Sequence, residues 1–289
     1  TTWQVPYGES VIEMAVDRGR IEGGGRKTPI CEIELELVSG RIADIFALTR
    51  ALQDDLDLRP AIASKAERGY ALFLGENPAP FKARTAPIDA SMTPVQAFRA
   101  IALGCLEHFQ RNERGLAAGD ADPEYVHQAR VALRRLRSAL KLFAPALPPD
   151  FVAAYGQAWQ SLASALGDAR NWDVFVTETL PPLVVAFPGH PDTRRLQREG
   201  TRRAKHARQA VAHLVALPDY PRVIVEFTAA LYALSDLLPD TLPDFAVRRL
   251  KSRARQARRL AERLDELTAD ERHRMRISFK KLRYARSEE

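Results

Sequence analysis

Apolar residues recur along most of this chain at the three- and four-residue spacing of amphipathic helices. From residue 94 onward this pattern predicts eight helices, expected at 94–112, 122–143, 150–167, 171–186, 192–215, 220–237, 244–267 and 270–286. Clusters of Pro interrupt the pattern, and Thr93 followed by Pro94 supplies a capping residue and a Pro at the first helical position. The turns between these helices are short, which favours antiparallel packing of neighbouring helices.

The first part of the chain alternates apolar and polar residues instead, as strands do. Residues 11–21 (VIEMAVDRGRI) alternate around a turn expected at 17–19, and residues 31–40 (CEIELELVSG) alternate strictly. A helix is expected at 41–56 and a further strand around 69–74. This pattern predicts a small α+β fragment ahead of the helices.

A segment with neither periodicity separates the two parts. Residues 77–93 (NPAPFKARTAPIDASMT) are rich in Pro and Ala, which is typical of a linker. We therefore expect a mainly α protein with a β-rich module at 1–76, this linker, and a helical domain at 94–289. The eight helices divide further into halves at about 94–187 and 190–289.

The two halves share a sequence motif, which indicates an internal duplication. VHQARVALRRLRSALK runs from 126 to 141 and RHRMRISFKKLRYARS from 272 to 287, an offset of 146 positions (273 − 127 = 146). At this offset the matched pairs are His127 and His273, Arg130 and Arg276, Arg134 and Lys280, Arg135 and Lys281, and Arg137 and Arg283. Two four-helix halves related by duplication would account for this repeat.

In the first copy the cationic residues share one side of the helix. An α-helix turns about 100° per residue, so His127, Arg130, Arg134, Arg137 and Lys141 fall within an arc of roughly 80°. Neither segment contains Asp or Glu, whereas a solvated basic face usually interleaves acids three or four positions away. The pattern therefore favours contact with a polyanion over a merely solvated face. Each histidine taken alone could instead be a neutral, hydrogen-bonded residue.

Two more of the expected helices carry rows of cations. Arg195, Arg198, Arg202 and Lys205 share one arc of the helix at 192–215, and Arg248, Lys251, Arg255 and Arg258 share one arc of the helix at 244–267. Each row has a Glu nearby, so a solvated surface explains it as well as a function does. If the rows lie around a pseudo-twofold axis, they would converge on a central channel and focus its potential. Arg253 and Arg263 point away from the row of their helix and are expected to matter little.

Charge is distributed unevenly along the chain, whose net charge is +6. Residues 1–83 hold 10 Lys or Arg and 13 Asp or Glu, whereas residues 190–289 hold 23 and 14. This asymmetry indicates an acidic module joined to a basic one. The pI of about 9.5 would suit nucleic acid, but the basic rows have almost no aromatic residues for base stacking, Tyr284 being the main exception. Nucleic acid is therefore not an expected partner.

Cysteine content and hydropathy suggest where the protein is found. Cys31 and Cys105 are too few for a disulfide framework or a metal knuckle, which suits a reducing compartment. No apolar run reaches the roughly 18 residues of a membrane span, and the first residues show no signal-peptide pattern. We expect a cytoplasmic protein with no membrane partner.

The paired H-x-x-R-x-x-x-[RK]-[RK]-L-R segments, the helical duplication and LGDARNWDVF at 166–175 resemble a CHAD domain, the conserved-histidine α-helical domain, over about 94–286. The resemblance implies two pseudo-symmetric four-helix bundles around a basic central channel that binds inorganic polyphosphate, and association with storage granules. No nucleophile–base pair or carboxylate dyad accompanies the cationic row, so we expect no catalytic residue and no cofactor in this domain. Carried over by position, the polyphosphate ligands would be His127, Arg130, Arg134, Arg137, Lys141, Arg170, His273, Arg276, Lys280 and Arg283.

EIELELVSG and SKAERGY resemble the C-terminal part of a CYTH domain, the triphosphate tunnel fold. The resemblance implies that Glu32, Glu34 and Glu36 hold Mg²⁺ or Mn²⁺ and that Lys65 and Arg68 contact a triphosphate. On pattern alone, a glutamate row on one strand face is more typical of a solvated edge than of a metal site. The opening E-x-E-x-K strand of that family is absent, so a closed tunnel is not expected from these residues. We expect no triphosphatase activity from this chain, with a metal-dependent triphosphate hydrolase as the alternative function.

Overall fold

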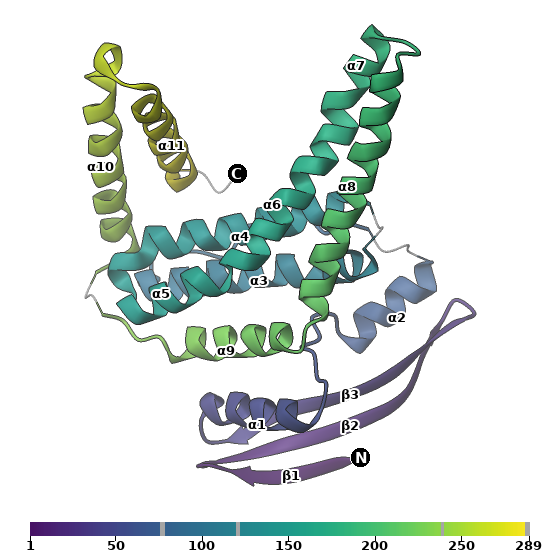
Figure 1. Ribbon diagram of the computed structural model, residues 1–289. Coiled ribbons are helices and arrows are strands. Elements are labelled where there is room, and N and C mark those ends of the chain that lie inside the picture. Colours follow the sequence, from purple (N-terminus) through teal and green to yellow (C-terminus); the bar gives the residue numbers. More distant parts are fainter. Residues whose placement is uncertain (76–78, 120–121, 238–239, 287–289) are drawn as a thin grey trace.

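The computed structural model describes residues 1–75, 79–119, 122–237 and 240–286, with side chains described as far as residue 279. The protein is mainly helical with a small antiparallel sheet at the N-terminus, as the sequence predicts. Figure 1 shows the sheet below a layer of helices and two helical arms that project from the opposite side of that layer. Among the described helices, none combines the length and the apolar character that crossing a membrane requires.

The N-terminal sheet consists of three antiparallel strands in the order β1-β2-β3. They are β1 (Thr2–Tyr7), β2 (Ser10–Gly23) and β3 (Arg26–Ser39). The turn expected at 17–19 is wrong, because β2 continues through it and the chain turns at Gly24 and Gly25, whose φ angles are 56° and 76°. Two consecutive residues with positive φ form the tight hairpin turn that glycine favours. This glycine pair therefore outweighs the weaker turn signal within β2.

Two helices accompany the sheet, α1 (Ile42–Asp55) and α2 (Lys65–Leu74). The strand expected around 69–74 is therefore wrong. Ser64 caps the N-terminus of α2 by accepting a hydrogen bond from the backbone N–H of Glu67 at 3.1 Å. Gly75, with a φ of 70°, ends the helix in the left-handed conformation. These two capping signals determine the conformation of a short segment whose apolar pattern alone is ambiguous.

The helical domain opens with two long helices that the sequence predicts, α3 (Pro94–Ala118) and α4 (Pro123–Phe143). At the start of α3, Thr93 and Gln96 form a reciprocal capping box, with hydrogen bonds of 2.9 and 3.2 Å. The α3 helix continues past its expected end at 112 and stops at Gly119. Helix α4 coincides with the expected helix to within one residue, so the cationic row has the helical spacing assumed for it.

The next region departs from the prediction of separate helices at 150–167 and 171–186. Its elements are α5 (Pro149–Ala158), α6 (Gln160–Val174), a π-helical turn (Phe175–Thr179) and α7 (Leu180–Ala186). The interruption lies at Trp159, whose side chain is almost fully buried. One of the two expected helices was to end at 167, but Gly167 lies inside α6. Leu166 and Ala169 on either side of it are both buried, so the core-facing stripe of the helix continues past this glycine.

The remaining helices are α8 (Pro191–Ala216), α9 (Asp219–Ala233), α10 (Leu242–Ala261) and α11 (Ala269–Arg286), with short 3₁₀ turns at Ala144–Ala146 and Leu264–Glu266. The first arm is formed by α6, α7 and α8, and the second arm by α10 and α11. Figure 1 shows the two arms rising from opposite ends of a layer that contains α3, α4, α5 and α9. The space between the arms therefore lies above α4.

One hydrophobic core joins helices from both expected halves. Trp159 packs edge-on against Phe227 with ring centroids 5.4 Å apart, and Phe143 stacks on Phe245 at 5.3 Å. These contacts link α4 and the start of α6 to α9 and α10. The expectation of two pseudo-symmetric four-helix bundles is not confirmed by this arrangement.

The N-terminal module is fastened to the helical domain on the side opposite the arms. Phe46 of α1 contacts Tyr232 of α9, with ring centroids 5.7 Å apart. Residues 79–92 form no helix or strand, yet they are held in place, because the Asn112 side chain bonds both the N–H and the carbonyl of Phe81 at 3.0 and 2.9 Å. The segment expected to be a linker is thus packed against α3.

Candidate anion-binding site

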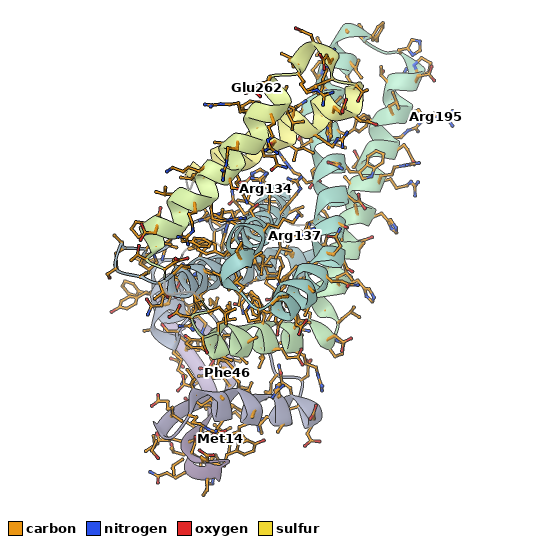
Figure 2. All side chains as sticks on the ribbon, turned by 90° about the vertical axis from the view of Figure 1, so that its left-hand side faces the viewer. Met14, Phe46, Arg134, Arg137, Arg195 and Glu262 are labelled. Carbon is orange, nitrogen blue, oxygen red and sulfur yellow. The ribbon has the colours of Figure 1, made fainter. Side chains whose placement is uncertain are left out.

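Helix α4 places its cationic row opposite the core, as its sequence predicts. Its apolar stripe is buried, with Leu133, Leu136 and Leu140 almost completely shielded from solvent. Arg130 and Arg137 are half-buried on the other side, whereas Arg134 and Lys141 are exposed. Because the apolar stripe fixes the rotation of the helix, the row must face the space between the arms. Figure 2 labels Arg134 and Arg137 of this row near the centre of the molecule.

A cleft of about 480 Å³ lies between α4, α6, α10 and α11. Six of its described lining residues are Arg or Lys, and none of the described lining residues is Asp or Glu. Four come from α4 and two from α10. The lining residues are Arg130, Arg134, Arg137, Ser138, Lys141, Ala163, Arg249, Ser252, Arg253, Gln256 and Ser278. Cations that converge on one concave surface raise the local potential far more than scattered ones.

The sequence pattern did not identify the α10 residues that line this cleft. Arg249 donates hydrogen bonds to the carbonyl oxygens of Leu142 at 2.9 Å and Lys141 at 3.3 Å, and so closes the C-terminal end of α4. Arg253 lies one turn further along α10 and is half-buried. Burial lowers the pKa of both guanidinium groups, and the charge of Arg249 lowers that of Arg253 further. Both groups nevertheless stay cationic at neutral pH.

The interpretation of α10 from its sequence needs correction. The predicted row of Arg248, Lys251, Arg255 and Arg258 is exposed on the outer face of the helix and does not line the cleft. Arg253, expected to matter little, faces the cleft instead. The signal that could have identified this face is its register with Phe245, because residues four and eight positions after that buried aromatic share its side of the helix.

His127 extends the α4 row beyond the cleft. Its Nδ1 is buried and has no hydrogen-bond partner among the described residues. Burial lowers the pKa of His127; Glu124 opposes this effect, while Arg170, Arg134 and Arg130 lower the pKa further. The influence of Arg170 places this α6 residue close to the same row. Its guanidinium also donates to Glu178 at 3.1 Å.

A buried ion pair supports the position of Arg170. Asp173, one turn after Arg170 on α6, is fully buried and accepts a hydrogen bond from Arg208 of α8. Burial raises the pKa of Asp173, and the charges of Arg208 and Arg170 oppose that rise. The sequence did not single out this pair, because its two members are 35 positions apart and meet only in the folded first arm. The pair fixes α6 against α8.

The other candidate cations lie outside the cleft. Arg198, Arg202 and Lys205 of α8 are exposed, and Arg202 is engaged by Glu199 through hydrogen bonds of 2.7 and 2.9 Å that lower the pKa of that glutamate to about 2. On α11, His273 and Arg276 are exposed, and the described cleft residue of this helix is Ser278, on the opposite side. The side chains of Lys280 and Arg283 lie outside the described residues. The first histidine segment, on α4, therefore shares its cleft with α10. The expected convergence of all four cationic rows is not observed among the described residues.

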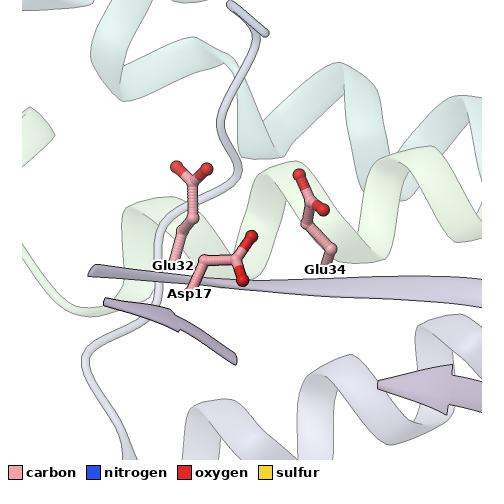
Figure 3. Close-up of side chains that lie close together, drawn as sticks. All are labelled: Asp17, Glu32 and Glu34. Carbon is pink, nitrogen blue, oxygen red and sulfur yellow. The ribbon is translucent and has the colours of Figure 1, made fainter. Parts of the chain in front are cut away.

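A second charged cluster lies on the sheet and is acidic. Asp17, Glu32 and Glu34 each bring one carboxylate oxygen within 4.8 Å of the other two. Figure 3 shows the three side chains close together on the sheet. The sequence missed Asp17, which enters the cluster because it pairs with Glu32 across β2 and β3. Glu36, predicted to be a ligand, is exposed and lies outside the described cluster.

The acidic cluster already contains its own cation. Lys65 of α2 hydrogen-bonds to Asp17 and contacts Glu34 at 2.9 Å and Glu32 at 3.4 Å. Arg68 contacts Glu32 as well. These hydrogen bonds raise the pKa of Lys65 and lower that of Asp17. Carboxylate oxygens suit Mg²⁺ or Mn²⁺, but a metal ion would have to displace the ammonium group, so the residues as arranged do not fit one.

Comparison with known proteins places these features in a family. Residues 100–287 match the family described as the CHAD domain. The chain is similar to the crystal structure of the CHAD domain from the plant Ricinus communis, with 33% identity, a TM-score of 0.58, and coverage of 72% of this chain and 69% of that one. It is also 44% identical over 72 residues to a Haemophilus influenzae protein named inorganic triphosphatase. That match spans 25% of this chain and a fifth (20%) of the relative.

Proposed function

This chain belongs to the CHAD domain family, and on that premise we propose that its helical domain binds inorganic polyphosphate in the cleft between α4 and α10. The observation that carries the proposal is the convergence of six Arg and Lys residues from these two helices on one concave surface. A linear polyphosphate has a negative charge on every phosphate and no other recognition feature. A track of cations therefore supplies the contacts that such a ligand needs.

The geometry of α4 suits an extended ligand. From Arg130 to Lys141 the helix advances about 16 Å, so the four cations form a track along its axis. Arginine can hold two phosphate oxygens at once, and charge-assisted hydrogen bonds of this kind are stronger than neutral ones. Gln160 accepts a hydrogen bond from Arg137, which orients that guanidinium at the α6 side of the cleft. His127 and Arg170 would extend the track toward the start of α4.

The chemistry of the cleft favours binding over catalysis. Its described lining residues include three serines but no histidine or carboxylate that could act as a base toward them. They also include no aromatic side chain, whereas proteins that bind single-stranded nucleic acid combine cations with stacking aromatics. We therefore propose that the cleft prefers polyphosphate to RNA.

The remaining candidate cations stay part of the proposal as a peripheral basic surface. The residues are Arg198, Arg202, Lys205, Lys251, Arg255, Arg258, His273, Arg276, Lys280 and Arg283. At long range they would raise the attraction of a polyanion without fixing its position. A cytoplasmic location remains a prediction from cysteine content and hydropathy, whereas storage-granule association and a pseudo-symmetric channel remain predictions from the family resemblance.

A titration with long-chain polyphosphate and with single-stranded RNA of matched charge, both at the same salt concentration, tests this function. We expect tighter binding of polyphosphate and a steep loss of affinity with salt, because bound cations replace counterions released from the polyanion. Equal affinity for the two polymers would indicate general electrostatic attraction and would remove the case for a dedicated site.

A second candidate function is metal-dependent triphosphate hydrolysis, favoured by the similarity to the triphosphatase and by the carboxylates of Asp17, Glu32 and Glu34. Against it, Lys65 occupies the centre of the cluster, and the described sheet has three strands with open edges. Metal-assisted phosphoryl chemistry needs an enclosed, preorganised site. We propose that this chain is catalytically silent. Turnover of triphosphate with Mg²⁺ or Mn²⁺ that disappears in Glu34→Gln would reverse this assignment.

A further inference from the structure

The end of the first arm exposes an unusual amount of apolar surface. Val185, near the end of α7, is 80% exposed, and Phe187, in the turn that follows, is 56% exposed. Leu183 and Leu196 on either side of the turn are also exposed. Figure 1 shows this end of α7 and α8 as the point of the arm farthest from the helical layer and the sheet. Large apolar residues gathered at a projecting end are typical of a contact surface.

The turn that presents these side chains is preformed. Pro181 and Pro182 stiffen the start of α7, and Gly189, with a φ of 75°, closes the turn before α8. The guanidinium of Arg194 donates a hydrogen bond to the carbonyl of Gly189 at 2.7 Å and ties the turn to α8. The apolar side chains are therefore held outward by a rigid hairpin, so little conformational entropy is lost when they are buried in a contact.

Cations flank the apolar end. Arg194, Arg195 and Arg198 are exposed on the first two turns of α8, and Asp192 is the single acid between residues 183 and 198. Figure 2 shows Arg195 close to the end of the arm. Asp192 lies in the first turn of α8, and the three arginines follow it within the next two turns, so the exposed surface at this end of the helix is predominantly cationic. A shallow hollow beside them is lined by Pro191, Arg194, Gln197, Arg198, Thr201 and Arg202.

We infer that the α7–α8 end of the first arm docks on an anionic lipid surface. Val185 and Phe187 enter the interface between headgroups and acyl chains, while Arg194, Arg195 and Arg198 contact headgroup phosphates. Apolar insertion combined with neighbouring cations is the combination that gives stable peripheral binding to anionic membranes. The sequence predicts no membrane partner because no segment could span a bilayer, but a peripheral contact needs no spanning segment. Arg198, which does not line the cleft, would then contact a headgroup phosphate.

The form of the surface favours a lipid over a protein partner. The apolar side chains lie on a projecting end and not in a groove, so an insertion of a few residues buries them completely. Cations on α8 match the charge of an anionic leaflet over a broad area, without requiring a shaped counterpart. The end of the arm also lies away from the cleft, so vesicle binding and polyphosphate binding are separable.

Co-flotation with vesicles tests the inference on the full chain. We expect binding to equimolar phosphatidylcholine and phosphatidylglycerol vesicles, and none to phosphatidylcholine alone. Val185→Ser with Phe187→Ser should reduce the bound fraction by at least about tenfold, because apolar insertion anchors the contact. Tyr70→Ser with Phe73→Ser, on equally exposed apolar residues of α2, is the matched control and should leave binding unchanged.

Three results would overturn the inference. The first is the absence of wild-type binding to the mixed vesicles. The second is loss of vesicle binding in Arg130→Ala with Arg134→Ala but not in the Val185 and Phe187 variant, which would mean that the cleft contacts the lipid. The third is self-association of the wild type that the Val185 and Phe187 variant abolishes, measured by analytical ultracentrifugation, because the end of the arm would then bind a second copy of the chain.

Discussion

Two regions of this protein each concentrate charge of one sign, and they handle it in opposite ways. The acidic cluster of Asp17, Glu32 and Glu34 receives Lys65 and Arg68 from the neighbouring α2, so its countercharge is built into the same module. The cleft gathers cations from α4 and α10, and no acid is among its described lining residues. The comparison shows two arrangements of concentrated charge: the carboxylates are paired with cations of their own module, whereas the described lining of the cleft collects cations from two helices far apart in the sequence.

The largest effect on this comparison should come from the centre of the α4 row. Replacing Arg130 and Arg134 together by Ala should weaken polyphosphate binding by at least about a hundredfold, because each charged hydrogen bond contributes on the order of 1.5–3 kcal/mol. The control is Arg20→Ala with Arg263→Ala, which removes the same charge from two exposed arginines paired with Glu22 and Glu266. Isothermal titration calorimetry measures both. Equal losses would mean that only net charge matters.

A smaller effect should separate the two faces of α10. Arg253→Gln removes a cation that lines the cleft, whereas Arg255→Gln removes one from the exposed outer face of the same helix. We expect the first to weaken polyphosphate binding by about tenfold and the second by less than about twofold, since exposed charges are screened by salt. The reverse order, measured in the same titration, would restore the row predicted from the sequence.

Proton uptake at His127 should give a modest pH dependence. In the protein without ligand, burial lowers the pKa of His127 below its usual value. Glu124 opposes this effect, while the nearby charges of Arg170, Arg134 and Arg130 lower the pKa further. Bound phosphate would raise the pKa of His127. Polyphosphate affinity should therefore increase as the pH falls through the pKa that His127 has in the complex. The increase should exceed that of the His127→Gln variant by about two- to threefold. Titrations from pH 8 to pH 5.5 on both proteins provide the measurement. Identical profiles would place His127 away from the ligand.

The smallest effect on ligand binding should come from the acidic cluster. Lys65→Met should leave polyphosphate affinity unchanged but lower the melting temperature at neutral pH, because three carboxylates would lose their shared cation. The pKa of Asp17 is lowered by Lys65, so this stabilisation is present above the usual Asp pKa and is lost as the pH falls below it. The melting temperatures of variant and wild type should therefore differ at neutral pH and become equal at acidic pH. A difference that persists in acid would indicate a packing role for the Lys65 side chain.

The sequence predicted those features that follow from local periodicity. The face of α4 that packs into the core can be predicted because Leu133, Leu136 and Leu140 form one apolar stripe. The absence of Asp and Glu from residues 126–141 identifies the opposite face as the candidate site. Helix α2 was mistaken for a strand because its ten residues are too few for a clear period, so its caps decide the outcome. In both cases the information lies within a few residues of the feature.

Features made by tertiary contact could not be predicted in this way. Arg249 and Arg253 enter the cleft because α10 packs at the end of α4, more than a hundred positions away in the sequence. Asp17 joins the acidic cluster through the register of β2 and β3, which depends on the position of the glycine turn. The buried pair of Asp173 and Arg208 likewise needs α6 and α8 to meet.

The central claim is that one polyphosphate contacts both walls of the cleft at the same time. A double-mutant cycle between Arg134 of α4 and Arg253 of α10, with polyphosphate affinity measured for the wild type, the two Gln variants and the double variant, tests it most directly. A ligand that spans both walls predicts coupling of about 0.5–3 kcal/mol between the two substitutions. Strictly additive losses would contradict the claim, because they would show that the walls attract polyphosphate independently.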